Sequence, residues 1–260
     1  MALAAVHHWI VVLDIEDFSS RPDPIQRSLR RAMYEVLREA LEQAGIPAAA
    51  VTTEDRGDGV LILVGARVPP VLLAGQLLRA LDDGLREKTA FFSAAHAMRF
   101  RVALHQGVVG RDADGWSGDA VNRAFRLVDA QPLRLVLAAA ERARLVFIVS
   151  DEVHQGVIRH DHRTIDPAAY LPVDFEAKHG VALRGWITVP GYPSPPGLDA
   201  PFEEPVVRAP HVAGAAGGDR SAPSTAGSVP SVVFHAGVVR GDQVAGDKHV
   251  HHAPGRQDRR

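Results

Sequence analysis

Strand-like and helix-like patterns alternate along roughly the first 190 residues, and this alternation restricts the chain to a fold that combines a sheet with helices. The first pattern is a short apolar run at residues 8–13, rich in β-branched side chains, which is typical of a central strand. The second is an apolar stripe at helical spacing over residues 25–41. Asp23, Pro24 and Gln26 suit the N-cap, the first helical position and the capping-box position of that helix.

The alternation continues beyond this helix. Two strands at residues 49–53 and 60–64 flank a tight turn at 56–59. The later patterns predict, in order, a helix that Pro69 and Pro70 open, a strand at 99–105, a glycine-rich loop at 107–118, a helix that begins at Ser117 or Asp119, a strand at 144–149, a short helix at 151–158, and a hairpin at 173–177 and 182–189. This order predicts an α+β sandwich with a mixed sheet, in which the first hairpin pairs beside the first strand.

Composition divides the chain into three parts. Residues 7–190 are expected to form one compact domain. Residues 191–230 are rich in Pro, Gly, Ala and Ser and carry no periodic apolar pattern. This predicts a flexible linker, because such a segment buries too little apolar surface to offset its ordering entropy. Residues 231–260 form a tail in which valines alternate among Gly, Asp and His, and it closes on a charged end.

Composition also excludes several classes of function. The chain has no cysteine, which excludes disulfides, thiolate catalysis and cysteine-ligated zinc, and which fits a reducing compartment. The net charge of −2 gives no indication of a general nucleic-acid or anionic-membrane surface. The amino-terminal apolar run is too short for a membrane span, and acids that follow it make it a poor signal peptide. We therefore expect a cytoplasmic protein without nucleic-acid or membrane partners.

Carboxylates gather at the ends of two predicted strands. Asp14 ends the first apolar run, and Glu16 and Asp17 crowd the same end, where like charges repel one another unless a cation is present. Asp58 lies in the turn RGDG, whose glycines let the backbone turn tightly and come close to a ligand. Two acids from neighbouring strand ends offer a hard oxygen site for Mg²⁺ or Mn²⁺. For either residue alone, an ordinary surface acid is the alternative interpretation.

Asn122 and Arg126 lie four residues apart on a predicted helix, so they share one face beside its apolar stripe. An amide and a guanidinium one turn apart can contact a sugar and a phosphate. For this pair alone, a solvated polar face is the alternative. The occurrence, in order, of the acid-ended strand, the acidic hairpin and this helix points to chemistry on a nucleoside triphosphate.

These segments resemble the class III nucleotidyl cyclases, the adenylyl and guanylyl cyclase homology domain. VVLDIEDFS resembles the first metal-binding segment of the family, and EDRGDGVLIL resembles the hairpin that carries the second metal-binding Asp. RVALHQG resembles the strand before the catalytic helix, and GDAVNRAFRL is similar to that helix. The resemblance covers residues 7–190 and implies a ferredoxin-like mixed β-sheet sandwich of the nucleotide cyclase type, in its bacterial form.

The resemblance implies a role for each of these residues. Two divalent metal ions, Mg²⁺ or Mn²⁺, would be bound by Asp14, Asp58 and the carbonyl of Ile15. Asn122 would orient the ribose, and Arg126 would stabilise the transition-state phosphate. The implied reaction converts a nucleoside triphosphate to a 3′,5′-cyclic nucleotide and pyrophosphate by two-metal chemistry. In the family the metal residues and the helix residues come from different subunits, which implies a head-to-tail homodimer.

The residues that choose the base depart from the family pattern. By spacing, Glu54 and Gly115 occupy the two base-selecting positions. Glu at the first suits a guanine edge, whereas Gly at the second has no side chain with which to read a base. The base is therefore left open between guanine and a pyrimidine. The resemblance also implies phosphate contacts at Phe18, Gly57 and Lys178.

The tail resembles amyloid-like signalling motifs at the ends of some bacterial immunity proteins, which implies an effector protein recruited by strand stacking. Embedded charges between residues 240 and 248 argue against a simple aggregating strand, and a disordered end is the alternative. Two functions follow. The first is a nucleotidyl cyclase, favoured by the four retained catalytic identities. The second is an inactive cyclase-fold module that senses nucleotide or signals and recruits an effector through the tail, favoured by the incomplete base selector.

Overall fold

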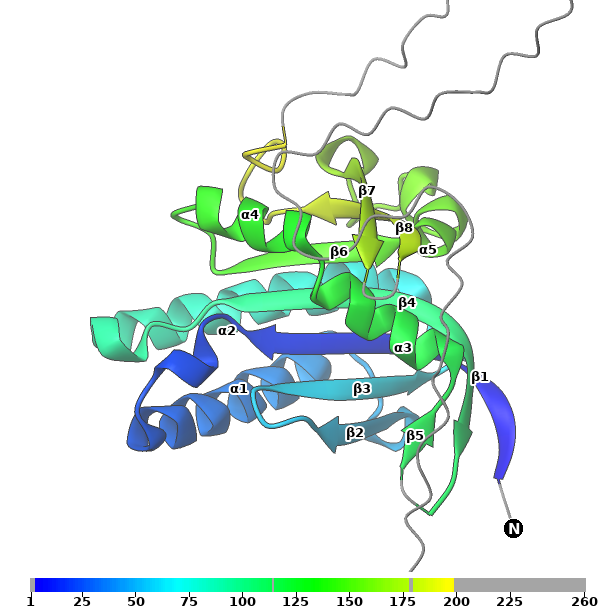
Figure 1. Ribbon diagram of the computed structural model, residues 1–260, viewed down its shortest axis with the longest axis horizontal. Coiled ribbons are helices and arrows are strands. Elements are labelled where there is room, and N and C mark those ends of the chain that lie inside the picture. The colour runs from blue at the N-terminus through cyan, green and yellow to red at the C-terminus, as the bar shows by residue number, and fades with distance from the viewer. Residues whose placement is uncertain (1–2, 114, 178–179, 199–260) are drawn as a thin grey trace, which may run out of the picture. The chain divides into compact units, whose positions relative to one another are not determined.

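The computed structural model describes residues 3–113, 115–177 and 180–198, and in this part of the chain one mixed sheet of eight strands forms the centre (Figure 1). Seven strands follow the order β2-β3-β1-β4-β6-β8-β7, and β5 pairs with the outer part of β4. The strands are β1 (Leu3–Ile15), β2 (Val51–Asp55), β3 (Gly59–Gly65), β4 (Phe100–Arg111), β5 (Trp116–Ser117), β6 (Leu145–Ser150), β7 (Leu171–Ala177) and β8 (Val181–Thr188).

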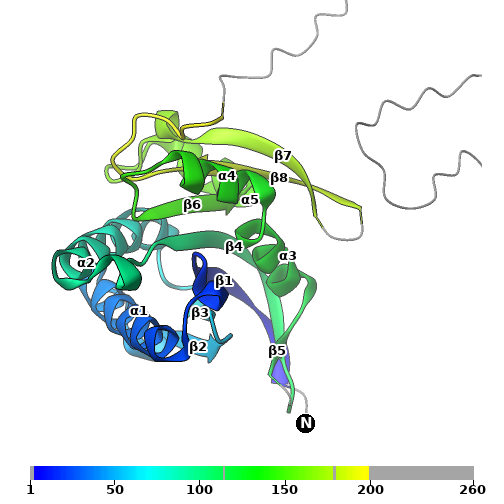
Figure 2. The same cartoon turned by 60° about the vertical axis from the view of Figure 1, so that its left-hand side comes forward.

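Helices cover both faces of this sheet (Figure 2). The helices are α1 (Asp23–Gln43), the π-helix η3 (Leu72–Leu77), α2 (Leu78–Phe91), α3 (Asp119–Val128), α4 (Gln131–Ala139) and α5 (Asp151–Gly156). Short 3₁₀ turns are formed by Phe18–Ser20, Ala48–Ala50, Ala94–His96, Ile158–His160 and Pro167–Ala169. Strands, helices and a mixed sheet in this order confirm the predicted α+β sandwich.

β1 lies inside the sheet because its side chains are apolar on both faces. It pairs antiparallel with β3 on one side and with β4 on the other. Val11 and Leu13 face the core under α1 and α2, whereas Ile10 and Val12 face the core under α3 and α4. The first hairpin therefore pairs beside the first strand, as predicted. The parallel pair of β4 with β6 makes the sheet mixed.

The first helix begins differently from the prediction. Pro22 is the N-cap of α1, and no side chain caps this end. Asp23 lies instead in the first turn, where the helix dipole favours a carboxylate. Gln26 does not complete a capping box, because its Nε2 donates to the carbonyl of Arg21 at 2.7 Å.

In the core under α3 and α4, the structure differs from the sequence prediction in two places. The expected loop at 107–118 is largely strand, because β4 continues to Arg111 and β5 pairs back onto it. Its glycines serve close packing: a Cβ on Gly107 would lie 2.5 Å from the Cβ of Ala120 in α3. Helix α4 was not predicted, because its segment QPLRLVLAA is short and almost continuously apolar, and such a run shows no clear helical period.

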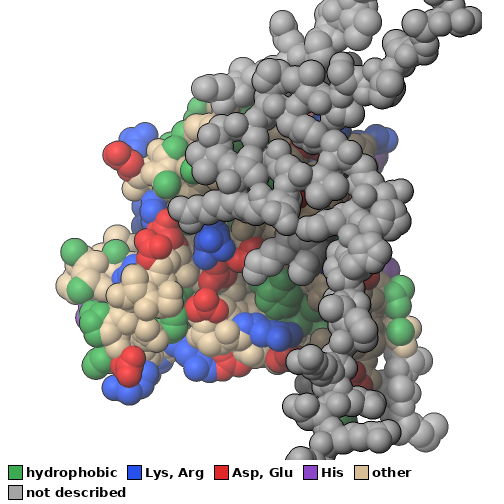
Figure 3. Space-filling view, viewed as in Figure 1, with side chains coloured by type: hydrophobic (Ala, Val, Ile, Leu, Met, Phe, Trp, Pro, Cys, Tyr) green, Lys and Arg blue, Asp and Glu red, His purple; other side chains and the backbone are tan. Residues whose placement is uncertain are grey.

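The predicted linker past residue 198 and the whole predicted tail at 231–260 lie outside the described residues. Among the described helices, none is both long and apolar enough to cross a bilayer. The face visible in Figure 3 carries basic and acidic side chains side by side rather than a patch of one sign.

Candidate functional site

The end of β1 and the β2–β3 turn bring Asp14, Ile15 and Asp58 together. Asp14 pairs with Gly59 across the sheet, and the Ile15 N–H donates to the Asp58 carbonyl at 3.0 Å. All three residues line one cavity of about 680 Å³, which we call the carboxylate cavity. The structure thus places the three sequence-predicted metal-site residues on one wall of one cavity.

Glycines set the shape of the turn that carries Asp58. Gly57 has a φ of 87°, and its N–H donates to the Asp55 carboxylate at 2.8 Å. A Cβ on Gly59 would lie 2.3 Å from the carbonyl oxygen of Leu13, so only glycine lets β3 approach β1 at this point. The Asp58 side chain is exposed and has no hydrogen bond or ion pair within the described residues. Its carboxylate is therefore available to a ligand.

Asp14 is a buried carboxylate with one cationic neighbour. It is 9% exposed and forms an ion pair with Arg101 of β4, its partner in the strand register. Burial raises its pKa to about 6, although the Arg101 charge lowers it, and the nearby Asp58 charge raises it further. The Nε of Arg101 is buried without a hydrogen-bond partner in the described part of the chain. Desolvation therefore outweighs the arginine in setting this pKa.

Sequence reasoning missed Arg101. The available signal was the antiparallel alignment of β1 with RVALHQG, which sets Asp14 opposite Arg101. Sequence reasoning also treated Glu16 as a free charge beside Asp14. The structure corrects this, because Arg99 binds the Glu16 carboxylate through two hydrogen bonds of 2.6 and 2.8 Å.

The carboxylate cavity fits divalent metal ions through its donor set. Asp14, Asp58 and the Ile15 carbonyl offer hard oxygen ligands, which Mg²⁺ and Mn²⁺ prefer. Among the described residues, no group of three or more His, Asp or Glu side chains is arranged to hold a metal ion. Such ions would therefore take their remaining ligands from water and from substrate phosphates, as Mg²⁺ commonly does in phosphoryl-transfer sites.

Asn122 and Arg126 lie on α3, outside this cavity. Asn122 is exposed and Arg126 is half-buried, and neither side chain has a hydrogen bond or ion pair within the described residues. Phe125 and Val128 of the same helix do line the carboxylate cavity. The structure therefore does not bring the helix pair and the metal-site pair together within one subunit.

The two predicted base-selecting positions are neighbours. A Cβ on Gly115, whose φ is 135°, would lie 3.2 Å from the Glu54 carboxylate. Glu54 also forms an ion pair of 2.8 Å with Arg56, whose guanidinium lies 5.1 Å from the ring centroid of Phe125. Glu54 is therefore linked through Arg56 to α3, and it fills the space that a side chain at 115 would need.

A second, smaller cavity of about 450 Å³ adjoins the turn. Phe18 and Gly57, two of the predicted phosphate contacts, both line it. Sequence reasoning missed its basic lining, which comes from Arg27 and Arg30 on the polar face of α1 and from Arg56. Lys178, the third predicted phosphate contact, lies outside the described residues.

Comparison with protein-family models finds no match, and comparison with curated proteins finds none either. Solved structures do match. The guanylyl cyclase Cya2 is 16% identical over 73% of this chain and 94% of its own, with a TM-score of 0.51. The guanylate cyclase domain of RhGC from Catenaria anguillulae, in complex with GTP, is 20% identical over 70% of this chain and 96% of its own, with a TM-score of 0.46. A bacterial light-regulated adenylyl cyclase is 18% identical over 73% of this chain and 52% of its own, with a TM-score of 0.49. The described part of the chain therefore shares the α+β fold of the guanylyl cyclase Cya2.

Proposed function

We propose that the protein is a cytoplasmic nucleotidyl cyclase, which converts a nucleoside triphosphate to a 3′,5′-cyclic nucleotide and pyrophosphate. One observation carries the proposal. On a cyclase fold, Asp14 and Asp58 line the same cavity, and acidic side chains outnumber arginines in its lining. A buried carboxylate with a raised pKa beside a second acid is typical of a site that binds cations or moves protons.

Asp14, Asp58 and the Ile15 carbonyl would hold the metal ions. Two bound divalent ions would supply charge neutralisation for the triphosphate and would favour ionisation of the ribose 3′-hydroxyl. The 3′-oxygen then forms a bond to the α-phosphorus, and the bond from that phosphorus to the pyrophosphate oxygen breaks. Arg27, on the wall of the adjoining cavity, would provide a cation for the outer phosphates, whereas Arg30 beside it already pairs with Asp55.

The helix pair would act from a second subunit. Arg126 presents a half-buried guanidinium without an ion pair, which suits the charge that develops on the α-phosphate. Asn122, one turn earlier, presents an amide that can orient the ribose. Because neither lines the carboxylate cavity of its own subunit, we propose a head-to-tail homodimer with two sites, each built from both subunits.

The base remains to be identified by assay. The Glu54 carboxylate can accept hydrogen bonds from the N1 and N2 groups of guanine, but Arg56 already binds it. Gly115 contributes no side chain and leaves no room for one beside Glu54. The substrate test should therefore include all four ribonucleoside triphosphates.

The test incubates the full chain with each triphosphate and Mn²⁺, and measures cyclic nucleotide and pyrophosphate. We expect both products from at least one triphosphate and none from Asp58→Ala. Asp174→Ala, the same change at an exposed position on β7, is the matched control and should remain active. No turnover of any triphosphate, despite metal-dependent nucleotide binding, would instead indicate a binding module.

Mixing inactive variants tests the shared site. Asp58→Ala and Arg126→Ala each damage both sites of a homodimer, but a mixed dimer contains one intact site. Random exchange should therefore restore up to about a quarter of the unmodified activity. A mixture of two separate Asp58→Ala preparations is the control. Activity that stays at the level of the single variants after subunit exchange would contradict the two-subunit site.

A further inference from the structure

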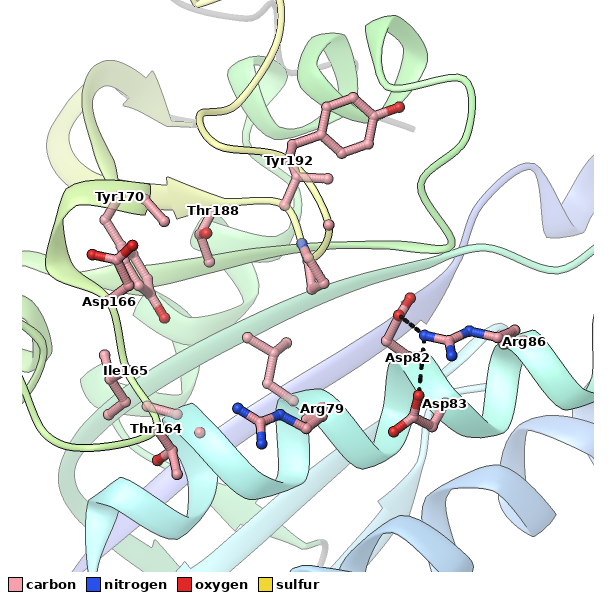
Figure 4. Close-up of a pocket in the computed structure, with 17 residues that line it drawn as sticks. Arg79, Asp82, Asp83, Arg86, Thr164, Ile165, Asp166, Tyr170, Thr188 and Tyr192 are labelled. Atoms are coloured by element: carbon pink, nitrogen blue, oxygen red, sulfur yellow. Dashed lines mark ion pairs between the residues drawn. The ribbon is translucent and has the colours of Figure 1, made fainter.

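A second cavity lies on the α2 side of the sheet and shares no lining residue with the carboxylate cavity. It has a volume of about 500 Å³, and we call it the Tyr170 cavity. Its walls are the η3–α2 segment, residues 164–170, and residues 188–192 at the end of β8 (Figure 4). Its size is in the range of small-molecule sites.

The floor of the Tyr170 cavity is an irregular helix. η3 is a π-helical stretch in front of α2, and such stretches occur mostly as local features near functional sites. A Cβ on Gly75 in this stretch would lie 2.3 Å from the Oγ1 of Thr164. Glycine therefore lets the segment that carries Thr164 lie directly against η3.

Tyr170 is a buried side chain whose hydroxyl has no partner among the described residues and reaches the cavity. Tyr170 is 6% exposed, and its ring packs edge-on against Phe147 with centroids 6.5 Å apart. Its hydroxyl makes no hydrogen bond to any described residue, and in Figure 4 it points from the sheet side toward α2. Burial raises the pKa of this phenol, so the hydroxyl keeps its proton and can donate. Thr188, also 6% exposed, likewise has no side-chain partner in the described residues and lines the same cavity.

In the described residues, the lining of the Tyr170 cavity contains one arginine without an ion pair. Arg86 pairs with both Asp82 and Asp83, and Arg144 also pairs with Asp82, so both acids that α2 contributes to the lining have cationic partners. Arg79 makes no ion pair within the described residues, and Figure 4 shows it extending from α2 toward Thr164.

The remaining acid in the wall is Asp166. Its carboxylate accepts the Ala168 N–H at 3.0 Å, which already uses part of its capacity. Apolar groups complete the lining, among them Leu78, Ile165 and Val189. Among the described residues, the lining thus combines apolar walls with hydroxyl donors and one arginine that makes no ion pair.

We propose that the Tyr170 cavity binds a small molecule that carries one anionic group, a carboxylate or a phosphate, on an apolar body. The Arg79 guanidinium and the Tyr170 and Thr188 hydroxyls bind the anionic group, and the apolar walls bind the body. An anion would accept charge-assisted hydrogen bonds from these three donors, which have no hydrogen-bond or ion-pair partner among the described residues. The site does not depend on the cyclase reaction.

The test is a titration of the full chain, followed through its backbone amide spectrum. Benzoate and phenyl phosphate are the two anionic probes, and benzyl alcohol is the neutral probe of similar shape. We expect saturable shifts at Gly75, Thr164 and Thr188 with a Kd of about 1 mM for at least one anion. The stronger of the two anions identifies carboxylate or phosphate as the preferred group.

Two variants and one control decide the assignment. Arg79→Gln should weaken the preferred anion about tenfold, and Tyr170→Phe about threefold, because each removes a donor to an ionised group. Arg67→Gln, which removes the same charge from an exposed position outside the cavity, should leave binding unchanged. The proposal is overturned if no saturable shift occurs up to about 20 mM, if benzyl alcohol binds as well as the anions, or if Arg79→Gln binds normally.

Discussion

His105 of β4 offers a test of how α3 is fixed to the sheet. Its side chain is 5% exposed, and a hydrogen bond of 2.8 Å joins its Nδ1 to the Oγ of Ser150, the N-cap of α5. Glu152 lies 4.0 Å from the same nitrogen and pairs with Arg123 of α3 at 2.5 Å. His105 therefore lies where β4, α3 and α5 meet.

The magnitude follows from the pKa of this histidine. Burial lowers it from 6.5 to about 4; the Glu152 charge raises it, and the Arg123 charge lowers it. Because the folded pKa lies below the unfolded one, the unfolded state binds more protons between these values, and stability falls as pH decreases through this range. Above about pH 6.5, the titration of His105 takes almost nothing from the free energy of unfolding. At pH 5, it lowers the free energy of unfolding by about 2 kcal/mol.

We therefore expect His105→Asn to remove this part of the pH dependence. Asn keeps a polar atom near the position of Nδ1 but has no proton to gain in this range. The measurement is urea unfolding at pH 7.5 and pH 5, followed by tryptophan fluorescence and analysed by linear extrapolation. Between the two pH values, the unmodified chain should lose about 2 kcal/mol more than His105→Asn.

Other titrating groups contribute equally to both proteins, so the difference isolates His105. Replacement of the exposed His162 by Asn is the control for a change of the same type elsewhere. The reasoning fails if His105→Asn loses as much stability between pH 7.5 and pH 5 as the unmodified chain.

Three further outcomes follow from the structure. Mn²⁺ at about 100 times its Kd should raise the free energy of unfolding of the unmodified chain by about 2.7 kcal/mol, an effect absent in Asp14→Asn; equal stabilisation of both would contradict the metal site. Gly107→Ala should lose about 2 kcal/mol in urea unfolding, because its Cβ would lie 2.5 Å from that of Ala120, and Gly107→Ala with Ala120→Gly should recover part of the loss. Gly115→Ala should lose about 1–2 kcal/mol in the same assay, because its φ of 135° and its contact with Glu54 both oppose a side chain.

The elements that local patterns define well could be predicted from the sequence. The apolar residues at helical spacing form the buried stripe of α1, and the β-branched run forms part of β1. Asp14 and Asp58 could be brought together in advance, because a tight hairpin beside the first strand places its turn at that strand's end. Their common cavity agrees with this argument.

The rest depended on contacts that no local pattern records. β4 runs through a glycine-rich segment because α3 packs against Gly107, and this close approach is a property of two elements together. Arg101 meets Asp14 only once the register of β1 and β4 is known. The Tyr170 cavity joins residues more than one hundred positions apart, from η3 to β8, and none of its segments carries a signal by itself.

The electrostatics of Asp14 depend both on the local sequence pattern and on tertiary contacts. Local patterns explain why a carboxylate ends the strand. However, Asp14 is only 9% exposed and its pKa is raised to about 6, so its ionised form opposes folding at neutral pH. Proteins tolerate such local violations mainly at functional sites, where a ligand offsets the cost. Arg101 offsets part of it, but among the described residues its own Nε has no partner, so the pair leaves the arginine incompletely satisfied. A cation bound at Asp14 would neutralise its carboxylate and free Arg101 for another ligand. This arrangement is expected if Asp14 and Arg101 evolved around a metal-bound triphosphate rather than around each other.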